Sequence, residues 1–232
     1  MNCSNPDLRY VQHTAAGAQY VRQITAQESD RSTRSAFREL ALSVAPSGAA
    51  LFDFGAGPGI DARFFAERGF TVDAYEVDPR MREFFTDHCR DLIGLGRVRL
   101  DARPYGEFLT HEPADNTRRA DLVIANFAPL NLVDDLRELF AKFHALTAPR
   151  GKVLANVLNP CFSGDMRFLA WWRGAPRLWR DGELFLPGPQ APYYRRLPGR
   201  FRAASAPHFR LSRVFRGLPL GRYMFLLFEK TS

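Results

Sequence analysis

The sequence predicts an α/β fold in which helices cover both faces of a parallel, doubly wound sheet. Short apolar runs alternate along the chain with segments whose apolar residues recur at helical spacing. This alternation is typical of βαβ units, in which helices join parallel strands. A glycine-rich turn directly after the first apolar run fits the same strand–turn–helix unit. The 232 residues, 46% hydrophobic and 25% charged, fit one globular domain and not a disordered chain.

The domain is expected to begin with an N-terminal helical cap at residues 1–46. Residues 8–45 look amphipathic, and Phe37, Leu40 and Val44 recur at helical spacing near the end of this segment. A Pro-Ser-Gly sequence follows and predicts that the helix ends there.

A core of alternating strands and helices is expected at residues 47–159. The five predicted strands are 49–54, 71–76, 98–101, 121–126 and 152–158. The predicted helices between them are 60–68, 79–92 and 133–146. Leu122, Val123 and Ile124 form a continuous apolar run, which is typical of a parallel strand covered on both faces. The helix at 79–92 begins with a proline, a residue that suits the first turn of a helix.

The pattern changes after this core. Residues 160–205 are rich in Pro, Gly, Arg and aromatic residues, and we expect them to form an insert that lies over the site as a substrate lid. Two β-like runs follow at 209–215 and 222–228, so residues 206–232 are expected to add an antiparallel strand pair at the sheet edge.

Charge is distributed unevenly along the chain. The net charge is +7, yet residues 161–232 alone carry 13 basic and 4 acidic side chains, which leaves a net charge of −2 for the rest. Such asymmetry favours an acidic partner or an anionic substrate near the last part of the chain, although arginines that merely solvate the surface would give the same count.

The compartment and the metal chemistry follow from other simple observations. The N-terminus lacks an apolar signal sequence and no run is long enough to span a bilayer, so a cytoplasmic protein without a membrane segment is expected. Cys3, Cys89 and Cys161 are few, odd in number and scattered, which argues against a disulfide framework and a zinc site. No cluster of His, Asp and Glu predicts another metal.

The strongest functional motif is the run from Asp53 to Gly59, which reads Asp-Phe-Gly-Ala-Gly-Pro-Gly. Gly55, Gly57 and Gly59 alternate, so the backbone can turn sharply and approach a ligand closely. The helix that follows would direct free N–H groups and its positive dipole end toward an anionic group.

Three further signals follow the next strands at the edge where open α/β sheets bind ligands. Glu76 ends the second strand and would accept hydrogen bonds from both ribose hydroxyls of an adenosyl group. Asp101 and Ala102 follow the third strand, where a carboxylate would meet an adenine amino group. Asn126 and Phe127 follow the fourth strand, although Asn126 would serve equally well as a turn cap.

The order of these motifs resembles the class I S-adenosylmethionine-dependent methyltransferases, over roughly residues 30–160 and the final strand pair. The resemblance implies a Rossmann-like sheet of seven strands with the last one antiparallel. It also implies S-adenosyl-L-methionine as cofactor and S-adenosyl-L-homocysteine as product. The residues expected to bind the cofactor are Asp53, Gly55, Ala56, Gly57, Gly59, Glu76, Val77, Met81, Asp101, Ala102, Asn126 and Phe127.

Nicotinamide dehydrogenases share the early glycine loop, but they usually place the third glycine three residues after the second. Here Gly57 and Gly59 are two apart. Asp53 also suits a ligand with a positive amine, which the methionine part of S-adenosylmethionine has and a pyrophosphate lacks.

The expected reaction is methyl transfer to an oxygen or nitrogen atom of a small molecule, with an anionic or carrier-protein-bound acceptor favoured. Aromatic side chains of the insert would form an apolar wall and its arginines would supply positive charge. The wall residues named by this hypothesis are Trp171, Trp172, Trp179, Tyr193 and Tyr194, and the arginines are Arg173, Arg177, Arg195 and Arg196.

A general base is required if the acceptor is a hydroxyl. No motif identifies that base, and the candidates are His13, Tyr193 and His208. Two other functions stay open. One is an RNA or other nucleic-acid methyltransferase that uses the basic last segment, and the other is a non-catalytic binding protein with the same fold. The sequence does not predict an oligomeric state.

Overall fold

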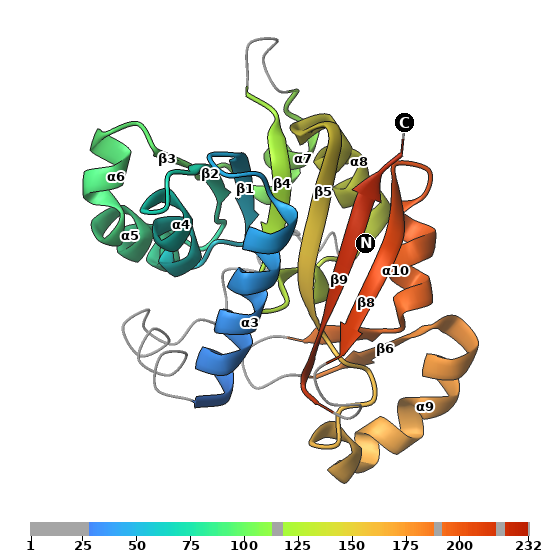
Figure 1. The fold of residues 1–232 in the computed structure, drawn as a ribbon. Helices are drawn as coiled ribbons and strands as arrows, with labels where there is room; N and C mark the ends of the chain where they lie inside the picture. The colour runs from blue at the N-terminus through green and yellow to red at the C-terminus, as the bar shows by residue number, and fades with distance from the viewer. Residues whose placement is uncertain (1–27, 113–117, 188–191, 217–220, 232) are drawn as a thin grey trace.

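The computed structural model describes residues 28–112, 118–187, 192–216 and 221–231, and its centre is a seven-stranded sheet (Figure 1). The strand order is β3-β2-β1-β4-β5-β9-β8. The strands are β1 (Ala50–Phe54), β2 (Thr71–Tyr75), β3 (Val98–Asp101), β4 (Ala120–Ala125), β5 (Thr147–Leu158), β8 (Phe209–Arg216) and β9 (Tyr223–Lys230). The first five are parallel, whereas β9 runs antiparallel to both β5 and β8. The predicted sheet with an antiparallel last strand is therefore confirmed.

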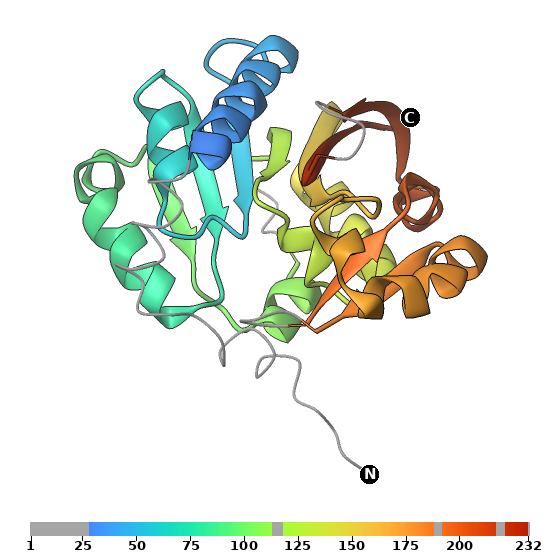
Figure 2. The same ribbon diagram turned by 90° about the horizontal axis from the view of Figure 1, so that it is seen from below.

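Helices lie on both faces of the sheet, which runs between them when the molecule is seen from below (Figure 2). The helices and short 3-10 turns are α3 (Glu28–Val44), α4 (Ile60–Ala66), α5 (Pro79–His88), α6 (Arg90–Gly94), α7 (Tyr105–Thr110), η1 (Pro129–Asn131), α8 (Leu136–Leu146), η2 (Asp165–Arg167), α9 (Leu169–Asp181) and α10 (Pro198–Ser205). Within these described residues, no helix is long and apolar enough to cross a bilayer.

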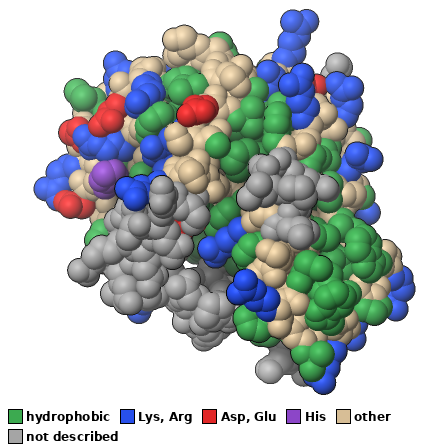
Figure 3. Space-filling model, turned by 60° about the horizontal axis from the view of Figure 1, so that its bottom comes forward, with side chains coloured by type: hydrophobic (Ala, Val, Ile, Leu, Met, Phe, Trp, Pro, Cys, Tyr) green, Lys and Arg blue, Asp and Glu red, His purple; other side chains and the backbone are tan. Residues whose placement is uncertain are grey.

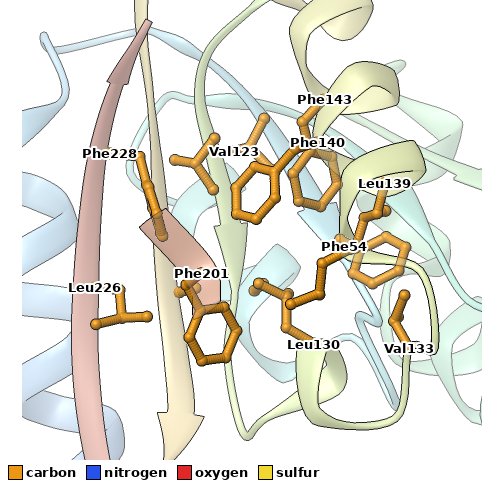
Figure 4. Close-up of a cluster of buried hydrophobic side chains, with 14 of the residues drawn as sticks. Phe54, Val123, Leu130, Val133, Leu139, Phe140, Phe143, Phe201, Leu226 and Phe228 are labelled. Atoms are coloured by element: carbon orange, nitrogen blue, oxygen red, sulfur yellow. The ribbon is translucent and has the colours of Figure 1, made fainter. Parts of the chain in front are cut away.

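Alternation of side chains along the strands divides the core into two layers. In β1, Leu51 packs with α3, α4, α5 and α6, whereas Phe52 and Phe54 pack with α7, α8 and α10. This division follows from the period of two in a strand, which directs successive side chains to opposite faces. The second layer is largely aromatic: Phe140 of α8 lies with its ring centre 5.0 Å from that of Phe228 in β9 (Figure 4). Burial on both faces explains the continuous apolar run of β4.

Three local features differ from the sequence-based expectations. The helix predicted at 79–92 breaks at Cys89, whose φ of −106° and ψ of 13° leave the helical region and separate α5 from α6. The short helix α7 was not predicted. The fifth strand begins at Thr147 and not at residue 152, because Thr147 already pairs with Ala120 before an irregularity in the ladder.

The expected insert contains two structurally distinct parts. Its first part forms α9 and a small antiparallel sheet of β6 (Glu183–Leu186) and β7 (Tyr193–Arg196), with Trp171 and Leu178 of α9 packed on Leu184. Its last part forms α10, whose fully buried Phe201 belongs to the main core beside α8 (Figure 4). Residues 198–205 therefore pack as a helix of the sheet layer, and α9 with β6 and β7 is the part that protrudes.

Candidate active site

The glycine loop is bound to the end of β2. The N–H groups of Gly55 and Ala56 both donate to the Tyr75 carbonyl oxygen, at 2.9 and 3.0 Å. Gly55, Gly57 and Gly59 adopt φ of +70°, +56° and +80°, which is the left-handed region that favours glycine.

The three glycines face different surroundings. A Cβ on Gly55 would lie 2.6 Å from Pro129 Cβ, and one on Gly59 would lie 2.8 Å from the Phe85 ring. A Cβ on Gly57 would meet no atom of the described residues within 4 Å. Close packing therefore requires Gly55 and Gly59, whereas Gly57 faces open space.

Glu76 lies beside this open space and is only 7% exposed. Its Oε2 accepts from the Gly57 N–H at 2.7 Å, and its Oε1 accepts from the Asp78 N–H at 2.8 Å. Burial raises the pKa of the Glu76 carboxyl, while these N–H groups oppose the rise. Each carboxylate oxygen has more than one acceptor position, so both oxygens still have capacity for a hydroxyl donor.

Asp53 lies at the end of β1 and is 2% exposed. Among the described residues, its Oδ2 has no hydrogen-bond partner. Burial raises the pKa of the Asp53 carboxyl well above its usual range, and the nearby Asp61 carboxylate adds to the rise. A buried carboxylate oxygen without a donor is costly, so this position favours a ligand that brings a hydrogen-bond donor or a positive charge.

Asp61 begins a charged cluster that attaches α3 to the loop, and sequence reasoning missed it. The Asp61 carboxylate pairs with Arg34, and its Oδ1 lies 2.7 Å from Arg38 Nε. Arg38 also donates to the Ile60 carbonyl oxygen at 2.9 Å. The spacing of the two arginines, four residues apart on one helix face, was the only signal in the sequence that could have indicated this cluster.

Asn126 connects the cluster to the ends of β4 and β5. Its Nδ2 donates to Asp61 Oδ2 at 2.9 Å, and its Oδ1 accepts from Asn156 Nδ2 at 2.8 Å and from the Phe127 N–H at 2.9 Å. The Asn126 side chain therefore contacts Asp61 near the start of α4 and the first residue of the following turn, although the 3-10 turn η1 itself has no side-chain cap. The buried Asn156, polar within a predicted apolar strand, was not singled out from the sequence.

The turn after Asn126 is strained. Phe127 and Ala128 have φ of +57° and +68°, a conformation that costs a non-glycine residue about 1–2 kcal/mol. The Ala128 N–H donates to the Asn156 carbonyl oxygen at 2.9 Å and holds the turn in place. As a result the Phe127 ring lies edge-on to Tyr223, with 5.8 Å between ring centres, and 4.4 Å beneath the Arg34 guanidinium carbon. Strain of this kind concentrates at functional sites.

The remaining predicted residues surround the end of β2. The Glu76 N–H donates to the Asp101 carbonyl oxygen at 3.2 Å, which brings these two positions together. The Asp101 carboxylate is held by its neighbour, with Arg103 Nε 2.9 Å from Oδ1. Burial would raise the pKa of Asp101, but its hydrogen bonds to Arg103 lower it overall. Val77 and Met81 are buried and Ala102 is exposed.

The structure contradicts the roles expected for two arginines. Arg195 and Arg196 are each only 2% exposed. Arg195 pairs with Asp165 and donates to the Asn159 carbonyl oxygen at 3.0 Å, while Arg196 pairs with Glu183 at 3.0 Å. The prediction that these guanidiniums are available to an anionic acceptor is wrong, because both are buried and each is paired with a carboxylate of the chain.

The prediction that aromatic side chains of the insert form an apolar wall is also wrong in part. Trp171 is buried in the core beneath α9, whereas Trp172 and Trp179 are exposed on the outside of that helix. Tyr194 donates to Asp134 Oδ1 at 2.9 Å. The Tyr193 ring centre lies 5.3 Å from the Arg195 guanidinium carbon.

The candidate general bases occupy different places. His208 precedes β8 at the opposite edge of the sheet, where its ring lies 4.8 Å from that of His144, so a role as base at the glycine loop is contradicted. His13 lies outside the described residues. Burial raises the pKa of the Cys89 thiol to about 12, which excludes a thiolate nucleophile there at neutral pH. Within the parts of the chain that the structure describes, no group of His, Cys, Asp and Glu forms a metal site.

A cavity of about 410 Å³ lies away from the glycine loop and Glu76. It follows the α7–α8 side of the sheet between Phe52, Arg99, Phe108 and Lys142, and it reaches Asp101. Arg99 is paired with Asp73, and Lys142 donates to the His111 carbonyl oxygen, so protein groups already satisfy these two cations. The Glu76 carboxylate, the open space at Gly57 and the buried Asp53 oxygen that has no partner among the described residues converge at the glycine loop, so we place the candidate site there.

Comparison with known proteins agrees with this geometry. A family model described as a methyltransferase domain matches residues 26–184. No curated protein matches the sequence. Many solved structures share the fold. Among them are a TehB-like S-adenosylmethionine-dependent methyltransferase from Corynebacterium glutamicum (12% identity, 93% of this chain and 98% of that one, TM-score 0.59), an S-adenosylmethionine-dependent methyltransferase from Mesorhizobium loti (14%, 84% and 96%, 0.61) and the magnesium protoporphyrin IX methyltransferase of Synechocystis PCC 6803 with bound S-adenosylhomocysteine (14%, 87% and 83%, 0.60).

Identities this low establish a shared fold only, whereas the family model covers more than half of the chain. The match begins just before α3 and extends into the region of α9 and β6, so it includes every element that contributes to the glycine loop, Glu76 and Asn126. The chain therefore belongs to the methyltransferase domain family, as an S-adenosylmethionine-dependent enzyme of class I.

Proposed function

We propose that the protein transfers the methyl group of S-adenosylmethionine to an oxygen or nitrogen atom of a small, anionic molecule. The observation that carries the cofactor site is the meeting of three features at one sheet edge. These are the open space at Gly57, the Glu76 carboxylate beside it and the buried Asp53 oxygen that has no partner among the described residues. Together they fit an adenosyl ligand that brings two hydroxyls and an ammonium group.

In this proposal the roles follow from donor and acceptor chemistry. Glu76 accepts from the two ribose hydroxyls, and Asp53 accepts from the ammonium group, directly or through a water. The backbone from Gly55 to Gly59, including Ala56, forms the floor under the methionine part. The residues assigned to the adenine side are Val77, Met81, Asp101 and Ala102, and those assigned to the methyl side are Asn126 and Phe127.

We place the acceptor beside Phe127. This ring faces Tyr223 at the carboxyl edge of the sheet, and the guanidinium carbon of Arg222 lies 5.3 Å from the centre of the Tyr223 ring. Arg222 is exposed and makes no ion pair with the residues described. Two rings at right angles give apolar contact, and an adjacent free cation favours an acceptor that carries a carboxylate or phosphate. Arg222 thus takes the anion-binding role that Arg195 and Arg196 do not have.

The bound cofactor supplies a methyl group already activated by its sulfonium. The tasks left to the chain are to align the acceptor with that methyl group and to exclude water. For a hydroxyl acceptor, we assign the role of general base, which accepts the proton of that hydroxyl, to Asp30. This residue lies one turn before Arg34 on α3. Its Oδ1 is buried and has no hydrogen-bond partner among the described residues. Tyr193 is the alternative base.

Calorimetry with S-adenosylhomocysteine tests the cofactor site. Glu76→Ala should weaken binding by about 1.5–3 kcal/mol, the usual contribution of hydrogen bonds to a charged group. Glu83→Ala removes an exposed carboxylate from α5 and is the matched control, which should bind as the wild type does. Wild-type affinity in the Glu76 variant, with the fold intact by circular dichroism, would show that the site is elsewhere.

A second assay tests the acceptor class. Transfer of a labelled methyl group should occur to small carboxylates or phosphates, and Arg222→Gln should raise KM for them while affinity for the cofactor stays unchanged. Tight, salt-sensitive retention of RNA with methyl transfer to RNA, and no transfer to small acceptors, would instead favour the nucleic-acid function.

A further inference from the structure

Helix α9 exposes large apolar side chains that the fold does not use. Phe168 and Leu169 at its start are 67% and 61% exposed, and Trp172 and Trp179 are 56% and 65% exposed. Leu169, Trp172 and Trp179 follow one another at intervals of three and seven residues, so they lie along one face of the helix. We call these four residues the α9 patch.

The opposite face of α9 already anchors the helix. Trp171 and Leu178 are buried there, and Gly174 allows Leu184 of β6 to approach so closely that an added Cβ would lie 2.1 Å from Leu184 Cδ1. Packing of the helix therefore does not require the patch. The indole N–H of Trp172 donates to the Met166 carbonyl oxygen at 2.8 Å, so its polar atom is satisfied and its ring can leave water without losing a hydrogen bond.

Arginines border the patch. Arg173 and Arg177 are exposed and lie on α9 beside the residues of the patch. Arg167 is also exposed and lies just before the helix begins. None of these three makes an ion pair within the described residues, whereas Arg180 on the same helix is paired with Asp181 at 2.8 Å. Figure 3 shows this end of the molecule, at its lower right, as a continuous hydrophobic area with basic side chains at its rim.

We propose that α9 docks the protein on the surface of an anionic lipid bilayer. Trp, Phe and Leu beside unpaired Arg on an amphipathic helix are typical of helices that lie in the interfacial plane of a membrane. Arginine side chains reach lipid phosphates while their stems stay apolar, and an anionic leaflet attracts them. The patch is the outer face of a protruding helix and not a groove, which suits a planar surface better than a peptide or a single ligand.

The docking surface goes beyond the proposed function and does not depend on it. α9 follows β5 through η2 and lies at the carboxyl edge of the sheet (Figure 1). A protein bound through α9 would therefore hold the edge that carries Glu76 and Phe127 close to the lipid surface. Binding to vesicles tests the surface without any assay of methyl transfer.

Sedimentation of the full chain with phosphatidylcholine vesicles, with and without phosphatidylglycerol, is the direct test. Binding should require phosphatidylglycerol and should weaken as salt is added. The emission of the three tryptophans should shift to shorter wavelength, since two of them belong to the patch. Trp172→Ser with Trp179→Ser should reduce binding more than about tenfold, and Arg173→Gln with Arg177→Gln should reduce it by about 30-fold.

Two matched variants separate the patch from general effects of charge and hydrophobicity. Phe185→Ser removes a half-exposed aromatic ring from the opposite face of β6, and Arg97→Gln with Arg213→Gln removes two exposed arginines elsewhere. Both should bind vesicles as the wild type does. The proposal is overturned if anionic vesicles do not bind, or if the patch variants bind no more weakly than these controls. It is also overturned if the wild type dimerises through the patch and the dimer does not bind the vesicles.

Discussion

The substitution Gly57→Ala tests two effects separately. Backbone strain in the loop affects the stability of the protein, and filling the open space above the loop affects the affinity for the cofactor. Alanine at φ of +56° costs about 1–2 kcal/mol. Part of this is offset by about 0.4–1 kcal/mol, because alanine restricts the unfolded chain more than glycine does. In the part of the chain that the structure describes, no atom lies within 4 Å of the added Cβ, so no steric clash there adds to the cost. The net loss of about 1 kcal/mol should lower Tm by about 2–4 °C in a domain of this size.

Cofactor affinity should fall much further. In the proposed site the methyl group of the new alanine would occupy the position where the ligand approaches the backbone. We expect S-adenosylhomocysteine to bind more than about tenfold more weakly, because the ligand must move or lose its contact with the N–H groups of the loop. Isothermal titration calorimetry measures the affinity, and differential scanning calorimetry of the protein alone measures the stability.

Gly48→Ala is the matched control. Gly48 has φ of +72°, is exposed, and an added Cβ would also meet nothing within 4 Å, but it lies in the turn before β1. It should show the same small loss of stability with unchanged affinity. If the Gly57 variant binds S-adenosylhomocysteine as tightly as the Gly48 variant does, the open space above Gly57 does not hold the cofactor.

Two more perturbations test buried charges. Arg196→Gln should destabilise the protein by about 1–3 kcal/mol, because it removes one of the two arginines paired with Glu183 and the donors to the Leu130 and Asp134 carbonyl oxygens, yet calorimetry should find the affinity for S-adenosylhomocysteine unchanged; a large loss of affinity would contradict a purely structural role. Asp53→Asn should raise Tm at neutral pH and should weaken the binding of the cofactor. The raised pKa of Asp53 means that ionisation opposes folding, so the gain in Tm should shrink as pH falls toward the usual aspartate pKa of about 4. A gain that grows on acidification would contradict this sign.

The sequence alone was sufficient for the parts of the fold that depend on local pattern. Strands with continuous apolar runs and the turns between them agree with the structure, because period, length and flanking turn residues are properties of short segments. The antiparallel last strand of the seven-stranded sheet was expected from the family resemblance and not from local pattern. The sequence also placed Asp53, Glu76, Asp101 and Asn126 at one edge, since parallel strands end on the same side of a sheet.

Positions that depend on small backbone changes were less predictable. The break at Cys89 and the early start of β5 at Thr147 involve single residues, and propensity does not distinguish one long helix from two short ones. The strained turn at Phe127 and Ala128 has no sequence signal either, because residues other than glycine rarely adopt such φ values.

Only the tertiary structure decided how charged side chains are used. Asp61 bonds to Arg38, 23 residues away in the sequence, and to Asn126, 65 residues away. Arg196 bonds to Glu183 on the neighbouring strand of the β6–β7 pair. From composition, every arginine after residue 160 was equally available to a substrate. Burial divided them: Arg195 and Arg196 became internal ion-pair partners, whereas Arg173 and Arg177 stayed exposed beside the α9 patch. The physical reason is that the free energy of a charge depends on its solvent and its partners, and both are set by contacts that no local pattern of residues encodes.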